Sequence, residues 1–324
     1  MDSVLVTGGA GYIGGHVCKA IRFAGFQPVV IDNLSTGFEK NVKWGPLHKV
    51  DLRDFKSSLA ELKAYTFVAA VHLAASAYVE ESQKMPLKYY ENNLLSTINI
   101  LRLLEALQIN YLVFSSSCAV YGETTMGKLN ESSALNPINH YGRTKKMCEE
   151  IITSISNSQG FKYITLRFFN ACGADLTGEL QEEHNPETHV IPRLIESGLN
   201  RSTFNVYGSD YPTLDGTAVR DYLHVSDLAM AHVESVRYLM AGGVSQVLNI
   251  GSGKGRSILD LIKSAKKIGL DIEVNFLPRR EGDPAELVAD ISRAGEVLEW
   301  KPKINSLEEI LSSTHYSREK NKFL

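Results

Sequence analysis

Short apolar runs alternate with amphipathic segments through the first half of the chain. The apolar runs are rich in Val, Ile and Leu and have the length of strands, at residues 4–7, 28–32, 48–52, 67–74, 111–117 and 162–170. Patterns with helical periodicity lie between them, at 12–25, 54–64, 85–107 and 140–158. Buried strands that alternate with helices indicate a parallel, doubly wound α/β sheet covered by helices on both faces.

The alternation becomes irregular after about residue 170. A polar stretch and a turn-rich stretch are followed by two helical patterns, at 178–189, 207–217, 226–241 and 257–269. We therefore predict a Rossmann-type domain over residues 1–170 and a smaller mixed α/β domain over 171–324. The chain is expected to cross back between the two.

Composition narrows the class of protein. The 324 residues are 44% hydrophobic, which is enough for a sizeable core, and the net charge of −3 gives no electrostatic argument for a nucleic acid or a membrane surface as partner. The N-terminus lacks the basic region of a signal peptide, and no apolar run approaches the ~20 residues of a membrane span. The cysteines are too scattered for paired metal ligands and too few for a disulfide framework, at positions Cys18, Cys118, Cys148 and Cys172. We expect a cytoplasmic protein and predict no metal site.

A glycine-rich turn follows the first predicted strand. In TGGAGYIG, Gly8, Gly11 and Gly14 are spaced G-x-x-G-x-x-G, which lets a pyrophosphate approach the backbone at a helix N-terminus. Taken alone, this spacing also fits an ordinary strand-to-helix turn. However, Asp32 ends the second strand 18 residues after Gly14, where a carboxylate can accept hydrogen bonds from a ribose diol. Because no arginine follows within DNLSTG, NAD is favoured over NADP.

A second glycine-rich segment, GSGKG at 251–255, also follows an apolar run and precedes a helical pattern. No acidic strand end follows it at the interval that a dinucleotide site requires. We interpret this segment as an ordinary turn.

Tyr141 and Lys145 are four residues apart on a predicted helix and therefore share one face. An ammonium beside a phenol, together with an oxidised nicotinamide, lowers the phenol pKa below its usual value of about 10 and yields a general base. Spacing alone also fits a solvated pair on a helix surface. The serines 115–117 favour proton transfer, because they end the fifth strand at the sheet edge where doubly wound folds bind ligands.

Further motifs resemble a known family. TGGAGYIG, the strand-end serine and YGRTK are similar to the extended short-chain dehydrogenase/reductase superfamily. Within it, VVIDNLSTG, FSSSCAVYGE, NPINHYGRTK, LRFFNACGA, DYPTLDGTAVRDYLHVSDLA and RREGDPAELVAD resemble the UDP-glucose (UDP-galactose) 4-epimerase family. The resemblance extends from about residue 3 to about residue 302.

The resemblance implies a reaction and its catalytic residues. Tyr141 would remove the proton from the sugar 4-hydroxyl, Lys145 would hold the nicotinamide ribose and lower the tyrosine pKa, and Ser117 would hydrogen-bond the reacting oxygen. Hydride would leave C4 for tightly bound NAD, and the 4-keto sugar would turn over before hydride returns to its other face.

The resemblance also implies two sets of binding residues. Besides the glycines and the catalytic pair, the NAD contacts would be Tyr12, Ile13, Asp32, Asn33, Asp51, Leu52, Leu73, Ala74, Asn93 and Phe169. The UDP-sugar contacts would be Asn170, His189, Asn205, Tyr207, Arg220, Arg280 and Asp283. Guanidinium groups suit a UDP pyrophosphate on independent grounds. Two structural alternatives stay open: Arg220 as an ion pair with Asp221, and His189 as an ordinary loop residue.

Several positions bear on the reaction and the sugar. Related dehydratases and decarboxylases place an acid just after the strand-end Ser or Thr, where this chain has Cys118 and Ala119, so an epimerase is favoured. Ala77 replaces a cofactor-contacting lysine of some relatives, which leaves the tightness of NAD retention open. Leu287 occupies the position whose size selects against N-acetylated sugars, and leucine is intermediate.

Alternative functions differ in the sugar or in the loss of catalysis. A 4-epimerase of UDP-xylose/UDP-arabinose or of UDP-GlcNAc/UDP-GalNAc shares the motifs, whereas a non-catalytic NAD-binding regulator would lose the Tyr/Lys pair. The resemblance further implies a homodimer that pairs the helices at 85–107 and 140–158. The apolar residues of INILRLLEALQI fit burial within one subunit equally well.

Overall fold

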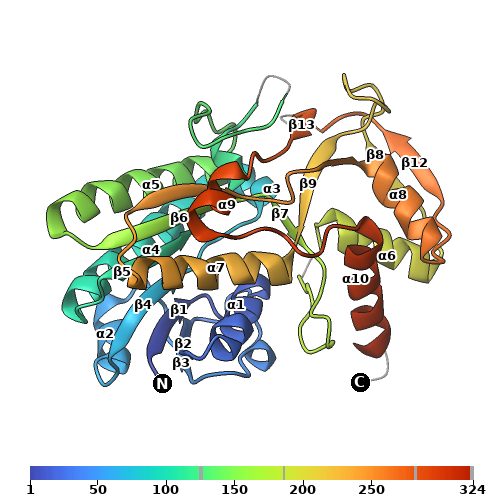
Figure 1. Ribbon diagram of the computed structural model, residues 1–324. Coiled ribbons are helices and arrows are strands. Elements are labelled where there is room, and N and C mark those ends of the chain that lie inside the picture. Colours follow the sequence, from blue (N-terminus) through green and yellow to red (C-terminus); the bar gives the residue numbers. More distant parts are fainter. Residues whose placement is uncertain (124–126, 185–186, 281–282, 322–324) are drawn as a thin grey trace.

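A seven-stranded sheet forms the centre of the protein in the computed structural model, which describes residues 1–123, 127–184, 187–280 and 283–321 (Figure 1). Its strand order is β10-β6-β5-β4-β1-β2-β3, and all neighbours are parallel. The strands are β1 (Ser3–Thr7), β2 (Gln27–Asp32), β3 (Leu47–Lys49), β4 (Phe67–His72), β5 (Tyr111–Ser115), β6 (Lys162–Phe168) and β10 (Gln246–Ile250). The predicted doubly wound α/β class is confirmed.

Helices cover both faces of this sheet. One face carries α1 (Tyr12–Phe23), α7 (Val225–Met240) and α9 (Ser292–Leu298), and the other carries α2 (Phe55–Leu62), α4 (Pro86–Ala106) and α5 (His140–Gln159). Successive strand residues point to opposite faces, so Val4 and Val6 join the core under α1 and α7 while Leu5 joins the core under α4. Because the side chains on both faces of the strand enter an apolar core, its successive positions 4–6 are all hydrophobic. This explains the continuous hydrophobic runs of the sequence.

Several predicted elements end earlier or divide. The run 67–74 leaves regular strand geometry after His72, although the Leu73 amide still donates to the Thr7 carbonyl (3.1 Å). The run 162–170 divides at Phe169 into β6 and a short strand β7 (Asn170–Cys172). The pattern 85–107 begins one residue late, at Pro86, because proline suits the first position of a helix, and a short helix α3 (Val79–Lys84) precedes it.

The seventh strand of the large sheet comes from beyond residue 170. β10 pairs with β6 from Gln246↔Ile164 to Ile250↔Phe168, and α7 packs against α1. The sequence predicted a helix at 226–241 but no strand at 246–250. The chain thus returns to the large sheet, while the boundary at 170 stays a prediction.

A smaller region lies beside the large sheet, on the right of Figure 1. It contains a sheet in which β9 pairs with β7, β11 and β13, and a two-stranded sheet of β8 and β12. Its elements are α6 (Val190–Asn200), β8 (Phe204–Tyr207), β9 (Val219–His224), β11 (Gly255–Ser257), α8 (Ile258–Lys267), β12 (Val274–Leu277), β13 (Glu286–Leu287) and α10 (Leu307–Asn321). Parts of two sequence features, the polar stretch 178–189 and the motif RREGDPAELVAD, lie outside the described residues, at 185–186 and 281–282.

No helix within the described ranges combines the length and the apolar character that crossing a membrane requires.

Candidate functional site

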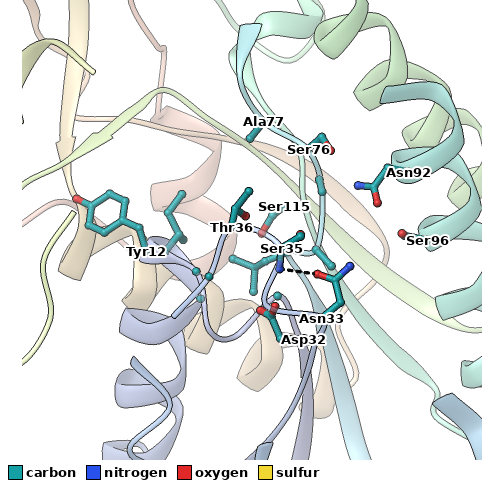
Figure 2. Close-up of a pocket in the computed structure, with 18 of the residues that line it drawn as sticks. Tyr12, Asp32, Asn33, Ser35, Thr36, Ser76, Ala77, Asn92, Ser96 and Ser115 are labelled. Carbon is teal, nitrogen blue, oxygen red and sulfur yellow. Dashed lines mark hydrogen bonds between the residues drawn. The ribbon is translucent and has the colours of Figure 1, made fainter. Parts of the chain in front are cut away.

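A cavity of about 330 Å³ opens at the carboxyl ends of β1, β2, β4 and β5. In Figure 2, Tyr12 lies on one side of it, Asn92 and Ser96 on the other, and Asp32 and Asn33 at its lower rim. Most of the predicted cofactor residues line it, namely Gly8, Gly11, Tyr12, Ile13, Gly14, Asp32, Asn33, Asp51, Leu52, Leu73, Ala74, Tyr141 and Lys145. Doubly wound folds bind ligands at this edge of the sheet.

The glycine-rich turn requires its glycines. Gly8 has a φ of +74°, and a Cβ there would lie 2.7 Å from the Ala74 nitrogen. A Cβ on Gly14 would lie 2.0 Å from the Gly8 carbonyl oxygen. Helix α1, which starts after this turn, has neither a side-chain cap at Gly11 nor an acidic residue in its first turn. The positive end of the helix dipole therefore meets the cavity without an acidic group in its own cap or first turn, which suits a pyrophosphate.

Asp32 places a carboxylate at the rim of the same cavity. Its side chain accepts hydrogen bonds from the amides of Ala10 (3.0 Å) and Leu34 (2.8 Å). Burial raises the pKa of Asp32, and these two hydrogen bonds oppose that rise. The held carboxylate can accept from a ribose diol, so the turn and Asp32 together fit the NAD that the sequence predicts.

Arg53 also lines the cavity, and sequence analysis missed it. Its guanidinium donates to both carboxylate oxygens of Asp51, at 3.0 and 2.7 Å, and lowers the pKa of Asp51 to about 2. The Asn33 amide donates to the same carboxylate (3.1 Å). Because Arg53 already pairs with Asp51, it does not offer an unpaired cation for the 2′-phosphate of NADP. This pairing agrees with the preference for NAD over NADP.

The three predicted catalytic side chains meet at the start of α5. The helix begins cleanly because the Asn139 side chain accepts from the Gly142 amide (2.7 Å), which places Tyr141 in the first turn. Tyr141 hydrogen-bonds Ser117, and the Lys145 ammonium lies 6.0 Å from the centre of the Tyr141 ring. Tyr141 and Lys145 are 7% and 4% exposed, which excludes the solvated surface pair.

The depression of the Tyr141 pKa, which we predicted for Lys145 together with an oxidised nicotinamide, stays a prediction, because the chain alone shifts this pKa the other way. Burial raises the pKa of Tyr141 to about 12, against a smaller opposing effect of its hydrogen bond with Ser117. Burial also lowers the pKa of Lys145 to about 8, and its ammonium donates to the Ser115 carbonyl (2.7 Å). The spacing in the sequence correctly placed the Lys145 ammonium near the Tyr141 ring. It could not show that both side chains are buried.

Of the predicted cofactor and catalytic residues, three lie outside the lining of the cavity. The Asn93 amide donates to the Ser76 carbonyl (3.1 Å) and the Thr144 hydroxyl (3.0 Å), so it joins a cavity-lining loop to α5. Phe169 is buried against Tyr121. Ser117 touches the site through Tyr141. Their contacts with a ligand stay predictions.

The predicted sugar residues gather mostly in the smaller region. The Arg280 guanidinium stacks on the Tyr207 ring, 3.9 Å from its centre. Arg220 forms an ion pair with Asp283, not with the neighbouring Asp221, so the predicted partner in the structural alternative is wrong, and a contact of Arg220 with UDP stays a prediction. The remaining members are Leu287, opposite Arg220 in the β13–β9 register, Asn205, bonded to Asn275, and Asn170, bonded to the Asp221 carbonyl.

His189 is the predicted sugar contact that also lines the cavity. It occupies the N-cap position of α6, and its Nδ1 lies 2.5 Å from Glu182 Oε1. Sequence analysis missed its neighbours Gln181, Glu183 and His184, which line the same wall. The alternation of Glu and His in GELQEEHNPETH was the available signal. Further lining residues were missed on other segments, among them Ser35, Thr36, Asn92 and Ser96.

The GSGKG segment is a turn around a buried carboxylate. Asp221 accepts from the amides of Ser252 (2.6 Å) and Gly253 (2.9 Å) and from the Ser252 hydroxyl (2.6 Å). These donors are therefore engaged by the protein itself, in agreement with the interpretation as an ordinary turn.

Comparison with known proteins defines the class. The sequence model of the NAD dependent epimerase/dehydratase family matches residues 4–251, and the chain belongs to this family. It is similar to the UDP-glucose 4-epimerase of Rhizobium meliloti (strain 1021), with 45% identity over 304 residues and 93% of each chain covered. The predicted NAD-dependent epimerase and its cofactor are confirmed.

Two solved structures show the same fold over nearly the whole chain. The UDP-glucose 4-epimerase from Brucella ovis in complex with NAD has a TM-score of 0.94 at 42% identity, with 98% of both chains covered. The UDP-glucose 4-epimerase from Stenotrophomonas maltophila, with bound NAD and formylated UDP-arabinopyranose, has a TM-score of 0.96 at 33% identity, with both chains fully covered (100%).

Proposed function

We propose that this protein interconverts UDP-glucose and UDP-galactose by reversible oxidation and reduction at C4, through a 4-keto sugar. The buried group of Tyr141, Ser117 and Lys145 beside the NAD-type cavity carries the proposal. When bound, NAD supplies the acceptor and donor of hydride. The chain supplies the general base, the hydrogen bonds and the sugar pocket.

Tyr141 holds and moves the proton of the sugar 4-hydroxyl at its phenolic oxygen. Its pKa of about 12 favours the protonated phenol, so the ionised form needs added positive charge in the occupied site. Lys145 lies on the same helix face and provides part of that charge. Ser117 already hydrogen-bonds the phenol and is placed to share the reacting oxygen.

The residues after Ser117 support epimerisation over elimination. Ala119 carries no titratable group, and burial raises the pKa of the Cys118 thiol to about 12. Neither side chain offers the additional acid that dehydration or decarboxylation would use. Retention of the Tyr/Lys/Ser group likewise disfavours the non-catalytic regulator.

The first experiment is the equilibration of UDP-galactose by the purified protein without added cofactor, scored by the UDP-glucose formed. Turnover supports the proposed epimerase with retained NAD. If there is no turnover even with NAD supplied, UDP-galactose as the substrate is excluded in favour of a pentose or an N-acetylated sugar. Relative kcat/KM for UDP-galactose, UDP-N-acetylgalactosamine and UDP-arabinose then identifies the sugar, and Leu287 becomes the residue to change.

Tyr141→Phe tests the assigned base. Turnover should fall by more than about 1,000-fold, within the range of general acid–base catalysis, while NAD content stays that of the wild type. A variant that keeps most of its kcat would contradict the assignment.

We also propose a homodimer and a cytoplasmic location. Most apolar residues of INILRLLEALQI, such as Ile100 and Leu103, are buried within the subunit, but Leu95 and Met147 are 39% and 40% exposed on the adjacent helices α4 and α5. A second copy would cover this face. Light scattering should give a dimer, and Leu95→Glu with Met147→Glu a monomer. The four cysteines are free thiols, as is usual for the reducing cytoplasm.

A further inference from the structure

Four metal-ligating side chains converge beside the cavity, on the segment between β7 and α6. Glu182, His184, Glu187 and His189 each offer one ligand atom, and these atoms all lie within 4.8 Å of one another. We propose that this cluster binds one Zn²⁺ ion. The inference goes beyond the proposed function, in which His189 alone of these four residues has a role, as a predicted UDP-sugar contact.

The distances suit a small tetrahedral site. Zinc bound to nitrogen and oxygen at 2.0–2.2 Å places its ligand atoms about 3.3 Å apart. The Nδ1 atom of His184 lies 3.4 Å from Glu187 Oε1 and 3.8 Å from Glu182 Oε1, and His189 Nδ1 lies 2.5 Å from Glu182 Oε1. Zinc binding therefore requires Glu182 and His189 to move apart, and His184 and Glu182 to approach each other, toward the tetrahedral value.

Glu182 gives independent support for a bound cation. Its side chain is only 1% exposed, and its Oε2 atom is buried without a hydrogen-bond partner among the described residues. A buried carboxylate oxygen without a donor is costly, because its hydration is lost and nothing replaces it. A cation that Glu182 binds through both carboxylate oxygens would satisfy this atom together with Oε1, the oxygen that faces the two histidines.

Neighbouring side chains hold the ligands in place. The rings of Tyr12 and Tyr78 meet the His184 ring edge-on, with centres 6.3 and 5.6 Å apart. Arg318 lies 3.4 Å from Glu187 Oε2, which leaves Oε1 directed at His184. Contacts of this kind around metal ligands fix their orientation and tune their affinity.

The donor set selects the metal. Two imidazoles and two carboxylates suit zinc, whereas Mg²⁺ and Ca²⁺ prefer oxygen ligands throughout. The His189 side chain is 49% exposed, which gives the ion a path from solvent. Because His184 and His189 also line the cavity, the bound ion would fasten this wall of the cavity to the start of α6.

The test measures zinc binding and uses no turnover. Protein treated with EDTA and dialysed is titrated with ZnCl₂ by calorimetry, in competition with a chelating dye. We expect one Zn²⁺ per chain, and X-ray absorption should show two imidazole nitrogens and two oxygens. His184→Ala and Glu182→Gln should each weaken binding by more than about 100-fold, beyond the loss of an outer-shell partner.

His48→Ala is the matched control, because His48 also pairs with a glutamate, Glu61, at 2.8 Å. Its zinc affinity should equal that of the wild type. Thermal unfolding of each variant verifies that it is folded, and His184, on a partly exposed segment, is the safer of the two ligand substitutions. The proposal is overturned if the wild type binds no zinc at micromolar concentrations or if folded His184→Ala binds it equally well.

Discussion

Two glycine-rich turns leave strands of the large sheet, and they differ in what their amide groups bind. The turn at residues 8–14 leads from β1 into α1, whose N-terminus has no side-chain cap and faces the cavity. The turn at 251–255 leads from β10 into β11, and its amides donate to the fully buried Asp221. Helix α8, which follows it, is closed by a capping box of Ser257 and Asp260.

The difference shows what makes a glycine-rich turn a ligand site. Both turns bring amide donors together, and such donors attract an anion. At the second turn the chain supplies that anion itself, because the amides of Ser252 and Gly253 donate to the Asp221 carboxylate. These amides are therefore not free to bind an anionic ligand. At the first turn the carboxylate of Asp32 accepts from one turn amide, that of Ala10, and from Leu34 beyond the turn, while the N-terminus of α1 keeps no side-chain cap.

Gly14→Ala should break the first turn and have the largest effect. The new Cβ would meet the Gly8 carbonyl oxygen at 2.0 Å, so the backbone must move. We expect NAD retention to fall by more than about 100-fold and the free energy of unfolding by about 3 kcal/mol. The NAD released from denatured protein measures the first, and urea unfolding the second.

Gly25→Ala is its control, since Gly25 has a φ of +95° and open space at its Cβ position. It should cost about 1 kcal/mol in backbone strain and leave NAD content unchanged. Wild-type NAD content in Gly14→Ala would refute the assigned phosphate site.

Asp221→Asn should break the second turn without affecting the first. An amide in place of the carboxylate turns an NH₂ group toward donors from Ser252, Gly253 and Ala289. The free energy of unfolding should fall by about 2–3 kcal/mol, as measured in urea, while NAD content stays normal. Loss of NAD with unchanged stability would mean that the second turn also serves the cofactor.

A fall in pH should change the stability contributions of His16, near the first turn, and of Asp221, at the second turn, in opposite directions. His16, in α1 after the first turn, is buried, and burial lowers its pKa to about 4 from 6.5. The unfolded chain therefore takes up this proton first as the pH falls, so the stability contributed by neutral His16 is present above pH 6.5 and lost toward pH 4. Burial raises the pKa of Asp221, so its stability contribution is instead present at low pH and lost as the pH rises through its folded-state pKa.

His16→Gln isolates the first of these effects. At pH 5 the wild type should lose about 2 kcal/mol through His16, and the variant should show a correspondingly flatter fall in unfolding free energy between pH 6.5 and pH 5. Chemical denaturation at both pH values provides the measurement. An unchanged slope in the variant would show that other groups carry the acid sensitivity.

Ser257→Ala should give the smallest effect. The Ser257 hydroxyl accepts from the Asp260 amide (3.0 Å) and donates to the Asp215 carboxylate (2.5 Å), so its loss should lower the unfolding free energy by about 1–2 kcal/mol. Ser158→Ala, which removes an exposed hydroxyl near the end of α5, should change it less. NAD content should be normal in both, and a loss of NAD in Ser257→Ala would contradict the separation of the two turns.

The first half of the fold could be predicted because its signals are local. Buried parallel strands are continuous apolar runs, and the helices between them begin at caps such as Asp54 and Asn139. Strand β10 escaped prediction because its sequence is short and its partner, β6, lies some 80 residues earlier in the chain. The short strands of the smaller region escaped for the same reason.

The candidate site divides in the same way. Spacing placed Tyr141 and Lys145 on one helix face, and the glycines with Asp32 at one sheet edge. It could not show that Arg53 is neutralised by Asp51, or that Arg220 pairs with Asp283 instead of its neighbour in the chain. These pairings depend on which loops meet.

The sequence by itself determined the class of fold, and it placed the glycines of the proposed phosphate turn and the proposed proton-transfer pair, Tyr141 and Lys145, because each depends on backbone geometry over a few neighbouring positions. Only the tertiary structure decided the environments. In it, Tyr141 and Lys145 are buried, and Asp221 accepts hydrogen bonds from the second glycine-rich turn. Glu182 lies close to two histidines beside the cavity. Burial and charge pairing depend on contacts between segments far apart in the chain. Local sequence patterns do not determine these contacts.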